Sequence, residues 1–146
     1  MILLDVNVLV YAFRESAPEH ETYANWLREA TAGTETLLLA DLVLVGFVRV
    51  VTNPKVVEPV VSGPQAIEFV EALCGSPRTQ LTLSSPAVWE QLGHLVRRDP
   101  QIKTNVVPDA YLAAVALTHG ARVATRDRGF GRFPGLRWFD PAVAAG

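Results

Sequence analysis

Short apolar segments alternate with longer stretches of helical periodicity along the chain, and this alternation limits the fold more than any other feature. We predict that the apolar segments are β-strands, because they are too short to be helices. They span residues 2–4, 36–40, 80–83, 122–125 and 136–139. Strands that alternate with helices are typical of a parallel sheet with helices on its faces. The sequence therefore predicts a three-layer α/β/α domain with a mainly parallel central sheet of four to five strands.

The helices between these strands are indicated by start and stop signals. Ser16 and Glu19 form an S-x-x-E capping box, which predicts a helix that ends at Gly33. Ser85 followed by Pro86 is a favourable start for a later helix. The other helices are expected directly after Asp5, over residues 41–53, from Pro64 to Cys74, and from Pro108 to Gly120. In the helix from Pro64 to Cys74, we expect Ile67, Val70 and Cys74 to face inward.

Composition places the chain among globular domains. It has 146 residues, of which 49% are hydrophobic, so we expect a single domain over residues 1–146 with a sizeable core. No uninterrupted apolar run approaches the roughly 18 residues of a membrane span, and no secretory signal is evident. Cys74 is the only cysteine, which excludes an intrachain disulfide and fits a cytoplasmic location. The net charge of −2 argues against a uniformly basic nucleic-acid coat.

Three aspartates occupy positions from which they can converge. Asp5 ends the first predicted strand, Asp127 lies just past the fourth, and Asp109 lies in the first turn of a helix. In a parallel sheet, ligands bind outside the carboxyl ends of the strands. Taken singly, each acid has a plain structural explanation as a helix cap, a partner of the helix dipole or a turn residue. Taken together, they predict one acidic site at the sheet edge.

Carboxylates that lie close together repel each other unless a cation stands between them. Oxygen ligands without a Cys or His cluster favour Mg²⁺ or Mn²⁺ over Zn²⁺. Such an ion activates water and polarises phosphate, so a phosphodiester is the expected substrate. Five arginines between residues 122 and 137, among them Arg126 and Arg128, are expected to contact the phosphates of RNA, and Arg49 is a further candidate for such a contact.

Three blocks of sequence resemble PIN-domain ribonucleases, and specifically the VapC-type toxins of type II toxin–antitoxin systems. They read "LLDVNVLVYAF", "GFVRVVTNPKV" and "NVVPDAYLAAVALTHGARVATRDRGFGRFPGLRW", and they keep the order and spacing of the family over almost the full chain. The resemblance implies a parallel sheet between helices. It also implies an endoribonuclease that depends on Mg²⁺ or Mn²⁺, a VapB-type antitoxin as partner, and a homodimer.

The same resemblance assigns roles to residues. Asp5 and Asp109 match the metal-binding acids of the family, and Asp127 completes the acidic set. Asn7 and Thr125 match the polar positions that support the site.

One position departs from the family pattern. Gly46 stands in the helix after the second strand, where the family usually has a glutamate. Asp41, five residues earlier, is expected to cap that helix rather than to replace the missing acid. The departure leaves the number of metal ions open. It also leaves an alternative function, a catalytically weak or inactive module that binds RNA or an antitoxin.

A second enzymatic alternative is a phosphohydrolase of the haloacid-dehalogenase type, which attacks with an aspartate at the end of the first strand. That class needs a second aspartate two residues later, where this chain has Asn7. Trp26, Trp89 and Trp138 are expected to fill the core or a dimer face rather than to stack on bases.

Overall fold

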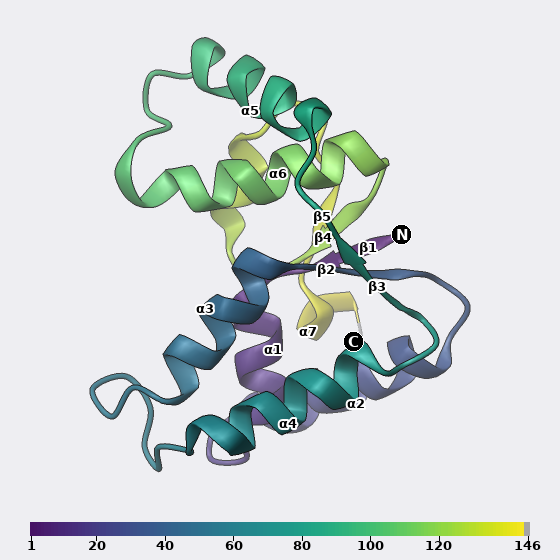
Figure 1. The fold of residues 1–146 in the computed structure, drawn as a ribbon, viewed down its shortest axis with the longest axis vertical. Helices are drawn as coiled ribbons and strands as arrows, with labels where there is room; N and C mark the ends of the chain where they lie inside the picture. Colours follow the sequence, from purple (N-terminus) through teal and green to yellow (C-terminus); the bar gives the residue numbers. More distant parts are fainter. Residues whose placement is uncertain (145–146) are drawn as a thin grey trace.

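The predicted strands form one parallel sheet. The structure is a computed structural model that describes residues 1–144. Its strands are β1 (Ile2–Leu4), β2 (Leu37–Ala40), β3 (Thr79–Thr82), β4 (Arg122–Ala124) and β5 (Trp138–Phe139). They lie in the order β3-β2-β1-β4-β5, and each neighbouring pair is parallel (Figure 1). The fold class predicted from the sequence is therefore confirmed.

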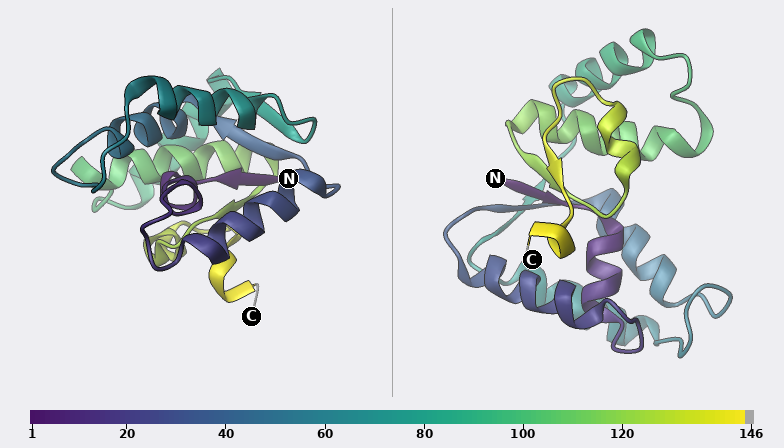
Figure 2. Two further views of the ribbon diagram at one scale, coloured as in Figure 1. Left: turned by 90° about the horizontal axis from the view of Figure 1, so that it is seen from below. Right: turned by 180° about the vertical axis from the view of Figure 1, so that it is seen from behind.

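Helices cover the sheet on both faces. Figure 2 shows α4 on the side of β1 opposite to α2 and α7, and Figure 1 shows α5 and α6 packed side by side. Among residues 1–144, no helix has the length and apolar character to cross a membrane. The helices are α1 (Val6–Phe13), α2 (His20–Ala32), α3 (Asp41–Val51), α4 (Gly63–Cys74), α5 (Pro86–Arg98), α6 (Val107–His119) and α7 (Pro141–Ala144), with 3₁₀ turns η1 (Thr104–Val106) and η2 (Arg128–Arg132).

The central strands are buried on both faces because helices cover both. Every residue of β1 and β2 is buried, which explains why these strands read as continuous apolar runs rather than alternating ones. By contrast, Gln80 and Leu81 on the edge strand β3 are exposed. The site described below lies at the carboxyl end of the well-packed central strand.

The capping box predicted at the start of α2 is wrong. Helix α2 begins at His20, its N-cap is Glu19, and no side chain caps it. The Ser16 hydroxyl instead donates to the Glu58 carbonyl at 3.3 Å, which draws this segment toward the loop before α4. A capping box is present at α4, where Ser62 and Gln65 bond reciprocally.

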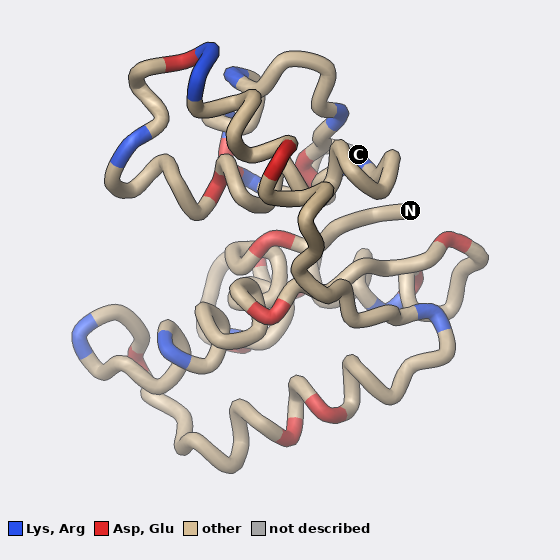
Figure 3. The backbone as a smooth tube through the Cα atoms, turned by 45° about the horizontal axis from the view of Figure 1, so that its top comes forward, with Lys and Arg blue, Asp and Glu red and all other residues tan. Residues whose placement is uncertain are grey.

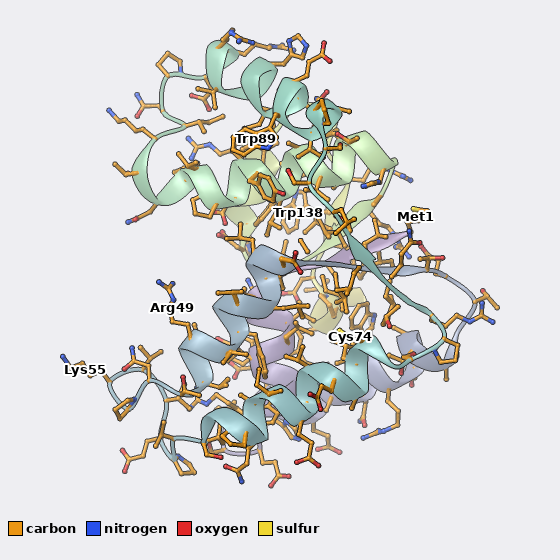
Figure 4. All side chains as sticks on the ribbon, in the orientation of Figure 1. Met1, Arg49, Lys55, Cys74, Trp89 and Trp138 are labelled. Carbon is orange, nitrogen blue, oxygen red and sulfur yellow. The ribbon has the colours of Figure 1, made fainter. Side chains whose placement is uncertain are left out.

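The burial prediction for Ile67 needs correction, and that for Trp89 is narrowed to one of its two alternatives. Ile67 on α4 is exposed, whereas Val70 and Cys74 pack partly buried against the core as predicted, beside the buried Ala66 and Leu73. Of the two places predicted for Trp89, the core is excluded, because 61% of its surface is exposed, and a dimer face stays a prediction. Trp89 projects from α5 near α6 (Figure 4) and donates from Nε1 to the Ser84 hydroxyl at 3.0 Å.

Candidate metal centre

Asp5 is fixed at the point where β1 turns into α1. It is the N-cap of α1 and is 7% exposed. Its Oδ1 accepts from the Val6 backbone N–H at 2.7 Å, and its Oδ2 accepts from the Thr125 hydroxyl at 2.7 Å and from Asn7 Nδ2 at 3.0 Å. A carboxylate offers about four lone-pair sites. Three are used here, and one on Oδ1 remains for a ligand.

Asn7 and Thr125 form a hydrogen-bonded frame behind this carboxylate. Asn7 Nδ2 also donates to Thr125 Oγ1 at 3.2 Å, and the Arg126 backbone N–H donates to Asn7 Oδ1 at 3.1 Å. Thr125 is fully buried, and its Oγ1 accepts from the Asp127 backbone N–H at 2.9 Å. The frame joins the ends of β1 and β4 and holds the Asp5 carboxylate, and the predicted supporting role of these two residues in a metal site stays a prediction.

Asp5 and Asp109 line the same cavity, which has a volume of about 380 Å³. We call it the acid cavity. Its wall comes from the end of β1 and the start of α1, from α3, and from the first two turns of α6. No described residue bonds to the Asp109 carboxylate through a side-chain or backbone donor within 3.5 Å, so its oxygens are free to bind a ligand.

The pKa values of both acids are raised. Burial raises the pKa of Asp109 to about 6, and the negative charges of Asp5 and Asp127 add to the effect, while Arg132 opposes it. Burial also raises the pKa of Asp5, against the hydrogen bonds from Thr125, Val6 and Asn7. The carboxylates therefore repel each other in the metal-free protein, and a bound cation would relieve this repulsion.

Asp127 stands beside the acid cavity rather than on its wall. Its Oδ1 accepts from the Gly129 backbone N–H at 2.7 Å and caps η2. Its charge nevertheless acts on both Asp5 and Asp109. In residues 1–144 no three His, Cys, Asp or Glu side chains are grouped closely enough to enclose an ion. The structure thus brings two of the three predicted acids to one cavity, and ligation by Asp127 stays a prediction.

The two acids on the cavity wall suit a hard divalent cation. Mg²⁺ is usually bound by one or two carboxylates and keeps several water ligands, so it does not need a closed cage of protein groups. Asp5 offers its remaining lone pair and Asp109 offers both oxygens. These oxygens would hold Mg²⁺ or Mn²⁺, and the raised pKa values indicate that protons compete with the metal below about pH 6.

Helix α3 contributes no acid to the cavity. Gly46 lines it, so position 46 does face the site, but glycine has no side chain with which to ligate. A Cβ atom at Gly46 would lie 3.0 Å from Val6 Cγ2, which shows how closely α3 packs on α1 here. The prediction that Asp41 caps α3 is wrong, because Asp41 is the first helical residue, and the N-cap, Ala40, has no side-chain bond.

Most of the arginines expected to contact RNA bond within the chain. Arg126 pairs with Glu19 at 2.8 Å, and its guanidinium lies 5.1 Å from the centre of the Tyr11 ring. Arg128 lies with Arg126 along a second cavity of about 310 Å³, apart from the acid cavity. Arg49, by contrast, lines the acid cavity itself.

The basic residues do not gather on one face. Figure 3 shows Lys and Arg positions on both halves of the molecule, interspersed with acids. Arg132, one of the five arginines expected to contact phosphates, instead lowers the pKa of Asp109 across 23 positions of sequence, and no sequence spacing indicated this effect.

Comparison with known proteins identifies relatives over nearly the full chain. The family model described as PIN domain matches residues 2–136. The VapC ribonuclease Mb2897 of Mycobacterium bovis is 40% identical over 141 residues, which cover 97% of this chain and 95% of the relative. Ribonuclease VapC31 of Mycobacterium tuberculosis is 33% identical over 143 residues, covering 98% of this chain and 100% of the relative.

Solved structures share the fold at lower sequence identity. The crystal structure of VapBC2 from Rickettsia felis, bound to a DNA fragment from the promoter, superposes with a TM-score of 0.71. The matched chain is 22% identical, and the match covers 96% of this chain and 98% of that one.

Proposed function

The chain belongs to the PIN-domain family and to its VapC branch, and from this premise we propose that it is a metal-dependent endoribonuclease that acts as the toxin of a toxin–antitoxin pair. The observation that carries the proposal is the acid cavity, where Asp5 and Asp109 lie on one wall at the end of the central strand. The Asp109 carboxylate has no described hydrogen bond and Asp5 keeps one free lone pair, and with raised pKa values the two fit a divalent ion better than a purely structural role.

We assign the following roles to the residues of the site. Asp5 and Asp109 bind the ion, and the frame of Asn7 and Thr125 keeps Asp5 pointing into the cavity. When Mg²⁺ or Mn²⁺ is bound, it supplies an activated water and neutralises charge on the scissile phosphate. Asp127 is placed to contribute negative charge at the same edge, and we propose it as the third acid of the set.

The proposed substrate is RNA and the proposed protein partner is a VapB-type antitoxin. Support for the antitoxin comes from the VapBC2 structure of Rickettsia felis, which resembles this chain in fold. Support for RNA comes from the relatives, which are named as ribonucleases. We further propose that the toxin is a homodimer and acts in the cytoplasm.

The test of catalysis is the Asp5→Asn variant. Purified wild-type protein is expected to cut RNA in the presence of Mg²⁺ or Mn²⁺ and not in EDTA, whereas Asp5→Asn should lose at least about 100-fold in rate. Expression of the wild type should arrest growth and Asp5→Asn should relieve the arrest. Asp41→Asn is the matched control, because Asp41 lies outside the acid cavity.

A second candidate function has one observation in its favour. Because Gly46 leaves α3 without an acid on the cavity wall, the chain could retain RNA or antitoxin binding without efficient cleavage. Wild-type protein that binds RNA tightly, and yet cuts it no faster than Asp5→Asn does, would replace the nuclease proposal by this one.

A further inference from the structure

Arg49 brings a positive charge to the acid cavity. Leu42, Gly46 and Arg49 recur along one face of α3, and all three line the cavity. Among the described residues of its wall, Arg49 is the only cationic one. Figure 4 shows its side chain projecting from α3 on the side nearer α6, the helix that carries Asp109.

The guanidinium of Arg49 has no described partner. Within residues 1–144 it makes no ion pair and donates no side-chain hydrogen bond, whereas Arg122, Arg126 and Arg132 each pair with a carboxylate. A guanidinium carries five N–H donors in a planar fork that matches phosphate and carboxylate oxygens. These donors are therefore available to a bound anion.

Arg49 lines the same cavity as the acids without pairing with them. No ion pair within 4.0 Å joins it to Asp5 or Asp109, and the arginine that lowers the pKa of Asp109 is Arg132. A cavity of about 380 Å³ offers room for an ion, several waters of roughly 30 Å³ each and one phosphate group. The cavity thus carries two carboxylates and one guanidinium that do not pair with each other.

The close packing of α3 on α1 explains why Arg49 can fill this role. Gly46 lies one turn before Arg49 and adds no side chain to the wall. Arg49 is consequently the polar side chain of α3 that can extend along the wall into the open volume. The valines around it are apolar and cannot bind an anion.

Resting on the proposed function, we propose that Arg49 binds the scissile phosphodiester through its guanidinium, in the cavity that Asp5 and Asp109 also line. Hydrolysis adds the oxygen of one water to phosphorus and breaks one phosphorus–ribose oxygen bond. The ribose oxygen leaves with a proton, and no oxidation state changes. Arg49 remains protonated throughout and transfers no proton, so its contribution is to orient the phosphate and to stabilise its developing negative charge.

The first test measures RNA binding without metal or cleavage. In the Asp5→Asn background and in EDTA, the affinity for a labelled single-stranded RNA of mixed sequence is measured between 50 and 200 mM salt. Loss of one phosphate contact lowers the slope of log affinity against log salt by about 0.7 for single strands. Arg49→Gln should show this decrease. Arg49→Lys should retain the slope, because it retains the charge.

The second test measures turnover in the otherwise wild-type protein. Arg49→Gln should reduce kcat by roughly 100-fold, and Arg49→Lys should fall between it and the wild type, because lysine lacks the planar fork. Calorimetric affinity for Mn²⁺ should not weaken in either variant. Arg28→Gln is the control, since Arg28 lies on α2 and bonds to Asn25 outside the cavity.

The outcomes separate this proposal from the nuclease assignment. The proposal is overturned if Arg49→Gln leaves the salt slope unchanged, or if Arg49→Gln turns over RNA as fast as the wild type. A loss of Mn²⁺ affinity in Arg49→Gln also overturns it, because that loss would indicate a merely structural role. If the wild type does not cut RNA at all, the proposed function fails, and the salt slope alone then decides whether Arg49 binds phosphate.

Discussion

Neutralising Asp109 should stabilise the metal-free protein while abolishing its proposed activity. The pKa of Asp109 rises from 3.8 to about 6, and one pKa unit corresponds to about 1.4 kcal/mol, so ionised Asp109 costs the folded state at most about 3 kcal/mol, because solvent screens this half-buried carboxylate. Asp109→Asn removes that cost and forfeits no described hydrogen bond. It also removes a favourable interaction with the N-terminus of α6, worth up to about 1 kcal/mol. The net gain expected at pH 8 is therefore about 1–2 kcal/mol.

The sign of the effect fixes its pH dependence. The folded-state pKa lies above the unfolded value of about 4, so below pH 4 Asp109 is protonated in both states and contributes no penalty. Between pH 4 and about pH 7, the unfolded state loses its proton first, and the wild type loses stability relative to the variant. The advantage of Asp109→Asn should therefore be near zero at pH 4 and complete by pH 8.

The assay is urea unfolding in EDTA, followed by circular dichroism at pH 4, 6 and 8. Asp41→Asn, which neutralises an exposed carboxylate of α3 outside the acid cavity, should show no comparable trend. Adding Mn²⁺ at pH 8 should stabilise the wild type by mass action and leave Asp109→Asn little changed. A wild type that is more stable than Asp109→Asn at pH 8 in EDTA would refute the electrostatic reasoning.

Two further substitutions test the surroundings of Asp5. Thr125→Val removes the hydroxyl that donates to Asp5 at 2.7 Å, so urea unfolding at pH 7 should show a free energy of unfolding lower by about 2 kcal/mol. Calorimetry should show Mn²⁺ binding weakened roughly 10- to 100-fold, as for other groups that orient a metal ligand. Unchanged Mn²⁺ affinity would contradict the orienting role. Gly46→Glu places a carboxylate on the cavity wall but brings its Cβ to 3.0 Å from Val6 Cγ2, so it should destabilise the protein by about 1–3 kcal/mol. Val6→Ala relieves this contact, so the double variant Gly46→Glu, Val6→Ala should bind Mn²⁺ more tightly than Val6→Ala alone. Equal Mn²⁺ affinities of the two proteins would show that a side chain at position 46 cannot reach the ion.

The sequence was sufficient to predict the fold where one physical signal dominated. The apolar runs of β1 and β2 and the helical periods between strands gave the parallel architecture, because burial on both faces leaves a strong pattern. Local capping signals were less reliable. Ser16 carries a capping sequence, yet it bonds to the Glu58 carbonyl 42 residues away, since a tertiary contact outweighs a local preference worth about 1 kcal/mol.

The candidate site was only partly predictable for a related reason. Convergence of Asp5 and Asp109 followed from their positions at element ends, and the structure places both on one cavity. The position of Asp127 beside that cavity depends on the local turn of η2, where its carboxylate caps the backbone of Gly129. A side-chain direction within a turn leaves no trace in the sequence pattern.

The strand order explains why the support for Asp5 comes from so far along the chain. β1 lies at the centre, with β2 on one side and β4 on the other, so the chain changes direction across the sheet at the carboxyl end of β1. At such a switch point the neighbouring connections diverge and leave a crevice. Asp5 and Thr125 follow the two strands that border this crevice, and their 2.7 Å hydrogen bond spans 120 residues of sequence. Any strand order that separated β1 from β4 would leave the Asp5 carboxylate without its buried donor, and the metal site proposed here requires that pairing.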